Sequence, residues 1–183
     1  VMPKIPPVPY CDELPEYFKL GETRAEIKLS NAEENMNAAL SLAEQARYSI
    51  NIFTQDMDDA IYNNEEFERH VFNLATRHPS AQIRILVQDS TSAIKKGHRL
   101  IRISQKLTSS IFIRNPPKIY KSDKSSFMVV DSIGTLYRAQ TDNHNYNASV
   151  NFMSPQRAGK LEDFFNEAWE HGVPDPQVRR LFV

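Results

Sequence analysis

Apolar residues along the chain follow two spacings: every second position, as in strands, and every third or fourth position, as in helices. Strand patterns are present at residues 24–29, 48–54, 81–88, 109–114, 127–130 and 135–139. Helix patterns are present at about 31–47, 67–77 and 92–106, and a last helix begins at Pro155. Strand and helix thus alternate three times before a two-stranded hairpin and a final helix. This order predicts an α/β domain with a mixed central β-sheet flanked by helices.

Proline is concentrated near the start of the chain. Five of the 11 prolines fall within residues 1–20, where they remove backbone donors and restrict φ. We expect residues 1–20 to be an arm or linker, residues 21–172 to form one folded domain, and residues 173–183 to be a C-terminal tail. An arm of this kind would suit a connection to an upstream domain or to a partner protein.

Composition excludes several classes of site. Cys11 is the single cysteine, so the chain holds neither an intrachain disulfide nor a multi-cysteine metal site. The five glycines lie at least 13 positions apart, which excludes a dinucleotide fingerprint, a phosphate-binding P-loop and a Gly-x-Ser-x-Gly elbow. The acidic stretch 56–59 lacks the glycine and the distal glutamate of a calcium loop, so we interpret it as an acidic loop. We therefore expect neither a metal ion nor a cofactor.

Membrane and secretion signals are absent from the sequence pattern. The longest apolar runs have four or five residues, far fewer than the roughly 20 that span a bilayer. The first residues do not have the basic and apolar regions of a secretory signal. We expect a cytoplasmic protein without a membrane span.

The net charge of −1 conceals a strongly basic segment. Residues 95–124 contain nine basic residues and one acidic residue, and the rest of the chain is acidic overall. Such a local excess is what a surface for nucleic acid or another anion would need. A solvated helix face followed by a loop explains it equally well. The candidates for a basic surface on the predicted helix are Lys95, Lys96, His98, Arg99, Arg102 and Lys106.

Motifs in the last third of the chain resemble those of the phospholipase D superfamily. In that family a hairpin strand carries His-x-Lys-x-x-x-x-Asp, a return strand leads to Gly-Ser-x-Asn, and a helix closes the unit. Here Val129-Val130-Asp131 resembles the end of the first motif, and Ser149-Val150-Asn151-Phe152 is similar to the second. Residues 161–169 are similar to the closing helix. The resemblance covers about residues 21–172 and implies a phospholipase D-like layered sandwich.

The two residues on which the family's chemistry depends are replaced here. Counting back from Asp131, Lys124 stands at the position of the nucleophilic histidine and Ser126 at that of the lysine. In the family the histidine forms a phosphohistidine, the lysine stabilises the phosphoryl oxygens and the aspartate helps to orient them. A lysine is protonated at neutral pH and has no free lone pair. None of the five histidines has a lysine two residues later, so no other register restores the motif.

The altered motif would still suit an anion, because lysine and serine both donate hydrogen bonds to phosphate oxygens. If the strands pack as the family's do, six residues would converge as candidates for binding phosphate: Lys121, Lys124, Ser126, Arg138, Ser149 and Asn151. In the simpler interpretation the lysines are solvated on a sheet edge and the asparagine caps a turn. Asp131 is then a remnant of the motif.

These observations predict a catalytically degenerate phospholipase D-like domain that acts as a binding or regulatory module and keeps a residual site for phosphate or another anion. Members with one motif per chain commonly pair, so the resemblance implies a homodimer. Similar degenerate domains accompany bacterial N-acetyltransferases, which suggests a protein partner of that kind. Two alternatives stay open: an active phosphodiesterase or nuclease with a relocated nucleophile such as His144, and a protein that binds nucleic acid through residues 95–124.

Overall fold

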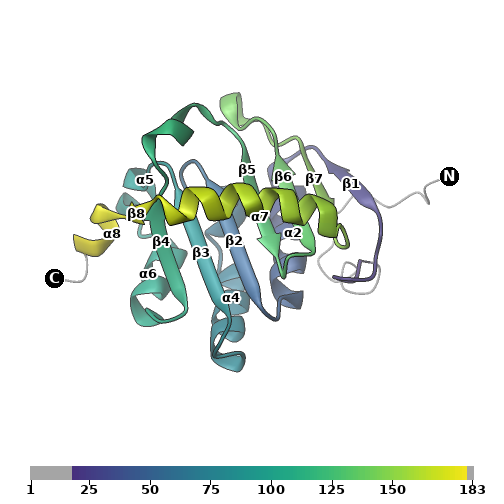
Figure 1. The fold of residues 1–183 in the computed structure, drawn as a ribbon, viewed down its shortest axis with the longest axis horizontal. Helices are drawn as coiled ribbons and strands as arrows, with labels where there is room; N and C mark the ends of the chain where they lie inside the picture. The colour runs from purple at the N-terminus through teal and green to yellow at the C-terminus, as the bar shows by residue number, and fades with distance from the viewer. Residues whose placement is uncertain (1–17, 181–183) are drawn as a thin grey trace.

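The computed structural model describes residues 18–180, which form one mixed β-sheet with helices on both faces (Figure 1). Its eight strands lie in the order β1-β7-β6-β5-β2-β3-β4-β8. Their bounds are β1 Glu26–Leu29, β2 Ser49–Thr54, β3 Gln82–Val87, β4 Ile111–Asn115, β5 Ser126–Val130, β6 Gly134–Arg138, β7 Ala148–Asn151 and β8 Val173–Pro174. The pairs β2–β3 and β3–β4 are parallel and the other pairs are antiparallel. The predicted α/β class with a mixed sheet is confirmed.

The helices divide the core into two layers. One face of the sheet carries most of them, and α7 alone crosses the other face (Figure 1). The bounds of the α-helices are α2 Ala32–Gln45, α3 Asp59–Tyr62, α4 Glu65–Arg77, α5 Thr91–Lys95, α6 Arg99–Lys106, α7 Pro155–Glu170 and α8 Pro176–Arg180, and the 3₁₀ helices are η1 Lys118–Ser122 and η2 Asp142–His144. Successive strand residues face opposite layers: Met128 and Val130 pack with the α2 side, whereas Phe127 and Val129 pack with α7.

Asparagine caps begin two of the predicted helices. The side chain of Asn31 accepts a hydrogen bond from the Glu34 amide at 2.8 Å, and that of Asn64 accepts one from the Phe67 amide at 2.8 Å. Each satisfies an amide that the helix itself leaves without a partner. Both helices were predicted from the sequence.

The helix predicted at 92–106 is two helices, α5 and α6. Gly97 lies between them with φ of +63°, a left-handed conformation that ends a helix and that glycine adopts without steric cost. The ring of His98 then caps α6 by accepting a hydrogen bond from the Leu100 amide. The expectation of one continuous helix was therefore wrong.

Both ends of the described chain belong to the domain. Phe18 is buried and its ring stacks on Phe152, with 5.6 Å between the centroids. The segment expected as a C-terminal tail begins with β8 and α8, where Val178 is buried in the core. The proline-rich arm was expected at residues 1–20, and residues 1–17 of it lie outside the described residues. Across residues 18–180, no helix is long and apolar enough to cross a membrane.

Candidate functional site

A cavity of about 300 Å³ opens at the edge of the sheet where β2 ends and β5 begins. Its wall is formed by the end of β2 and the segment after it, by Ser126 at the start of β5, by Arg138 at the end of β6, by parts of the loop 141–146, and by Lys96. The carboxyl ends of parallel strands in α/β sheets are the usual place for ligands, because several loops meet there. The cavity is therefore the candidate site of this fold.

A buried ion pair fills one side of the cavity. A guanidinium nitrogen of Arg138 lies 2.8 Å from a carboxylate oxygen of Asp58, and the side chains are 5% and 13% exposed. The other terminal nitrogen of Arg138 donates to the carbonyl of Asn145 at 2.9 Å. The guanidinium carbon lies 4.4 Å from the ring centroid of Tyr146, whose hydroxyl donates to Asp58 at 3.1 Å. Charge, stacking and hydrogen bonding thus hold Arg138 in one position.

Asp58 serves as the centre of this network. One of its oxygens accepts hydrogen bonds from the Tyr146 hydroxyl and the Ala60 amide, and the other accepts from Arg138. Burial, with the nearby Asp58 carboxylate, raises the pKa of Tyr146 to about 12. The phenol therefore stays protonated at neutral pH and keeps donating to the carboxylate.

Carboxylates outnumber cations around the cavity. The ammonium of Lys96 is 2.7 Å from a carboxylate oxygen of Asp59, an exposed pair at the rim. Asp56 and Asp58 also line the cavity, and Arg138 is its other lysine or arginine. Since three carboxylates face two cations, the cavity has no net attraction for a dianionic phosphate.

Ser126 and Lys124, which the resemblance aligns with the catalytic lysine and histidine of phospholipase D, do not lie together in the structure. Ser126 lies in the cavity, but its hydroxyl donates to the carbonyl of Phe53 at 3.1 Å. Lys124 is exposed and is not part of the cavity wall; its ammonium lies 3.5 Å from the carbonyl of Lys121. His144 lines the cavity from the opposite loop, where its exposed side chain makes no hydrogen bond among the described residues.

The structure does not bring the six phosphate-binding candidates together. In β6–β7, Tyr137 lies opposite Ser149 and Thr135 lies opposite Asn151. Cross-strand partners share a face of the sheet and neighbouring residues alternate. Ser149 and Asn151 therefore belong to the α7 face, whereas Arg138 and Ser126 belong to the α2 face. Lys121 and Lys124 lie in the exposed loop around η1, so only Ser126 and Arg138 share the cavity.

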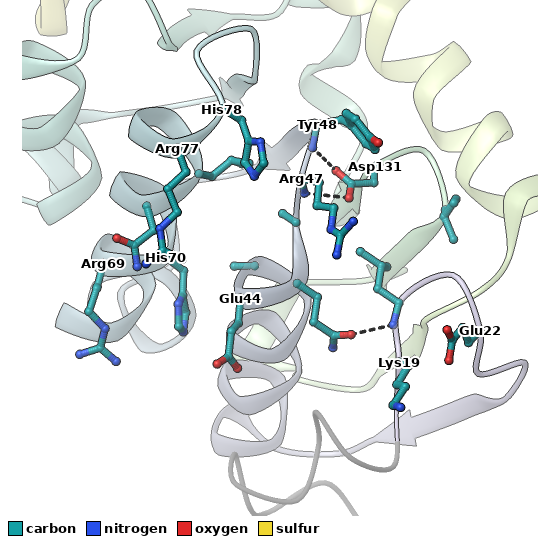
Figure 2. A pocket seen from close by; sticks show the side chains of 17 residues that line it. Lys19, Glu22, Glu44, Arg47, Tyr48, Arg69, His70, Arg77, His78 and Asp131 are labelled. Carbon is teal, nitrogen blue, oxygen red and sulfur yellow. Dashed lines mark hydrogen bonds between the residues drawn. The ribbon is translucent and has the colours of Figure 1, made fainter.

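Asp131 lies at the far end of β5 from the cavity. It is five positions after Ser126, about 16 Å along a strand. Its carboxylate accepts hydrogen bonds from the amides of Arg47 and Tyr48 at 2.9 and 2.7 Å (Figure 2) and from the amide of Ser49 at 3.0 Å. Asp131 thus fixes the start of β2 against the hairpin, a structural role outside the candidate site.

The basic segment is less available than its composition suggests. His98 was wrongly predicted as a surface residue: it is fully buried, with Nε2 2.8 Å from the Met57 carbonyl and Nδ1 accepting from the Leu100 amide. That burial lowers the pKa of His98. Within residues 18–180, Lys96 is paired with Asp59 and Arg99 with Glu68, and the exposed cations without an ion pair on this helical region are Lys95, Arg102 and Lys106.

Sequence reasoning did not identify Asp58 and Tyr146 as partners of Arg138. Asp58 was assigned to an acidic loop, and 80 residues separate it from Arg138. No local pattern joins residues at that separation. The one available signal was an arginine in a predicted strand, because an arginine needs a charged partner when it is buried.

A comparison with protein families shows the family of this chain. A model of the family described as "Domain of unknown function (DUF7931)" matches residues 31–181. The chain belongs to this family. A comparison with curated proteins found no match.

Three solved structures share the architecture. NucT from Helicobacter pylori has a TM-score of 0.60 at 12% identity, over 84% of this chain and 100% of that chain. The phospholipase D family member Nuc from Salmonella typhimurium has a TM-score of 0.58 at 15% identity, over 82% of this chain and 99% of that chain. TrmBL2, an archaeal chromatin protein, has a TM-score of 0.62 at 15% identity, over 84% of this chain. This chain spans about half of TrmBL2, 54% of its length. The fold of this DUF7931 domain is thus phospholipase D-like.

Proposed function

We propose that this DUF7931 domain is a non-catalytic binding or regulatory module on a phospholipase D-like fold. The ion pair between Arg138 and Asp58 carries this proposal. Arg138 is the buried cation of the cavity, and its charge is already neutralised by a carboxylate of the same chain. Phosphoryl transfer would need that charge on the substrate and a free nucleophile beside it.

Binding of phosphate in this cavity would have to displace Asp58. The carboxylate would then stay in a largely buried place without its cation, which is strongly unfavourable. Ser126 offers a hydroxyl in place of a full positive charge, and that hydroxyl already donates to a backbone carbonyl. We propose that the residual anion site is weak in this state and strengthens only when the negative charge of Asp58 is removed.

Thermal unfolding in inorganic phosphate tests this part of the proposal. A ligand stabilises the native state by an amount that grows with its concentration relative to its Kd. We expect 10 mM phosphate, compared with chloride at equal ionic strength, to leave the Tm of the wild type unchanged and to raise that of Asp58→Asn. Ser126→Ala in the Asp58→Asn background should reduce the gain. Phosphate stabilisation of the wild type equal to that of Asp58→Asn would contradict the proposal.

One observation favours the alternative of a relocated nucleophile: His144 lines the cavity. Activity on bis(p-nitrophenyl) phosphate and on single- and double-stranded DNA distinguishes the two. We expect no turnover above a heat-denatured control. Turnover that His144→Ala abolishes, and that His171→Ala leaves intact, would overturn the non-catalytic proposal.

We also propose that the domain forms a homodimer and serves an accessory role to another protein, of which a bacterial N-acetyltransferase is the candidate partner. The dimer is supported by the resemblance to single-motif members of the superfamily. The accessory role is supported by TrmBL2, in which this fold occupies about half of a longer chain. Light scattering after size-exclusion chromatography should give twice the mass of the chain, and a monomer at 100 µM would contradict the dimer.

A further inference from the structure

A groove of about 950 Å³ surrounds the C-terminal end of α2, at the opposite end of β5 from the Arg138 cavity. One side is formed by α4 and the other by residues 19–22 and the turn at 131–133 (Figure 2). Asp131 lies in this groove and Ser126 lies in the cavity, so the length of β5 separates the two places.

Four cationic side chains line the groove: Lys19, Arg47, Arg69 and Arg77. All four are exposed, and none has an ion pair or a side-chain hydrogen bond among residues 18–180. Two carboxylates without such partners, Glu22 and Glu44, also line it. Asp131, which accepts hydrogen bonds from three backbone amides, also lines the groove. Four cations thus face three carboxylates, which leaves an excess of positive charge.

Helix capping does not account for these arginines. Arg47 follows the end of α2 and Arg77 is the last residue of α4, where a cation favourably meets the carbonyl groups of a helix end. Neither guanidinium, however, donates a hydrogen bond to those carbonyl groups in the described structure. Each therefore keeps its donors for an external acceptor.

The cations extend over a distance that exceeds a single phosphate group. Arg69 and Arg77 lie on one face of α4, eight residues and about 12 Å apart along the helix axis. Figure 2 shows them on one side of the end of α2, with Arg47 and Lys19 on the other side. A chain of phosphates can contact all four, whereas one small anion cannot.

An exposed aromatic side chain lies within the same groove. Tyr48 is 71% exposed and follows Arg47 directly. An exposed ring next to free cations is the arrangement on which unpaired bases stack while arginine and lysine contact the backbone. An acidic peptide would use the cations but would gain little from the ring.

We propose that the groove around the end of α2 binds single-stranded nucleic acid, with Lys19, Arg47, Arg69 and Arg77 on phosphates and Tyr48 under a base. This inference does not depend on the proposed function of the Arg138 cavity, because the two places share no residue. It also differs from binding through residues 95–124, none of which lines the groove.

Fluorescence anisotropy with a labelled 20-nucleotide oligo(dT) tests the proposal. With four phosphate contacts, the slope of log K against log salt should be about −2.8, at about −0.7 per contact. In Arg69→Ala/Arg77→Ala two contacts are lost and the slope should fall to about −1.4. Arg69→Lys/Arg77→Lys keeps the charges and should restore the slope, and Tyr48→Ala should weaken binding about tenfold at unchanged slope.

The matched control is Arg102→Ala/Lys106→Ala, which removes two exposed cations from α6 and changes the net charge equally. We expect it to bind like the wild type. No binding at 50 mM salt would overturn the proposal. Loss of binding in the α6 variant but not in the α4 variant would overturn it in favour of residues 95–124. Equal affinity for a poly-glutamate peptide, together with no effect of Tyr48→Ala, would overturn it in favour of a general polyanion surface.

Discussion

Replacement of Arg138 by methionine tests whether the ion pair holds the candidate site together. The variant keeps most of the side-chain volume and leaves the Asp58 carboxylate without its cation. Removal of one partner of a buried pair typically costs about 3–5 kcal/mol. Asp58 retains the Tyr146 hydroxyl and the Ala60 amide as donors and is 13% exposed at the cavity. We therefore expect the lower end, about 3 kcal/mol.

Asp58→Asn and the double variant Arg138→Met/Asp58→Asn complete a double-mutant cycle. The asparagine leaves the Arg138 guanidinium with the Asn145 carbonyl and the Tyr146 ring, so we again expect a loss of about 3 kcal/mol. Because the two residues contact each other, the double variant should lose less than the sum, with a coupling of about 1–3 kcal/mol. Each single variant should lower Tm by about 6–12 °C in a chain of this size.

Urea unfolding followed by far-UV circular dichroism and by the fluorescence of Trp169, the single tryptophan, measures these differences. Lys96→Met is the matched control, since it removes a cation from the exposed pair with Asp59 at the same cavity. Exposed pairs contribute up to about 1 kcal/mol. Losses below about 1 kcal/mol in both single variants, or strict additivity in the double variant, would refute the reasoning.

Three further predictions concern residues outside the ion pair. Burial lowers the pKa of His98 from 6.5, so on acidification the unfolded chain takes up a proton at this histidine before the folded chain does. The free energy of unfolding should therefore decrease below about pH 6.5. Urea unfolding at pH 7.5 and 5.5 should show a smaller decrease in His98→Gln than in the wild type, and an equal decrease would contradict this. Asp131→Ala leaves three amides without their acceptor and should cost about 2–3 kcal/mol in chemical unfolding, more than Asp131→Asn, which keeps one oxygen. The Cβ that Gly97→Ala adds would have no atom within 4 Å, but residue 97 has a φ of +63°. The backbone conformation alone should therefore lower the free energy of unfolding by about 1 kcal/mol, and a stabilised variant would be the contrary result.

Local patterns in the sequence predicted most of the fold correctly. The helices α2 and α4 form where periodicity predicted helices at about 31–47 and 67–77, and the capping asparagines Asn31 and Asn64 act on amides only two or three residues away. The short apolar stretches at 127–130 and 135–139, on either side of a turn, predicted the hairpin that the structure forms as β5 and β6, because this signal is also local. The assignment of Lys124 and Ser126 to the positions of the phospholipase D histidine and lysine uses only residue identities and spacing, and it stays a prediction. The helix predicted at 92–106 contains Gly97, and the left-handed conformation of that glycine divides it into α5 and α6.

The tertiary structure alone decided what the site contains. Whether Asn151 faces the cavity or α7 depends on the register between β6 and β7, and a shift of one residue would turn it to the other face. The pairing of Arg138 with Asp58 joins residues 80 positions apart, and the burial of His98 depends on the loop that supplies the Met57 carbonyl. Periodicity shows which residues of one helix or strand are apolar. It does not show which elements contact each other, and those contacts determine which charges pair and which residues are buried.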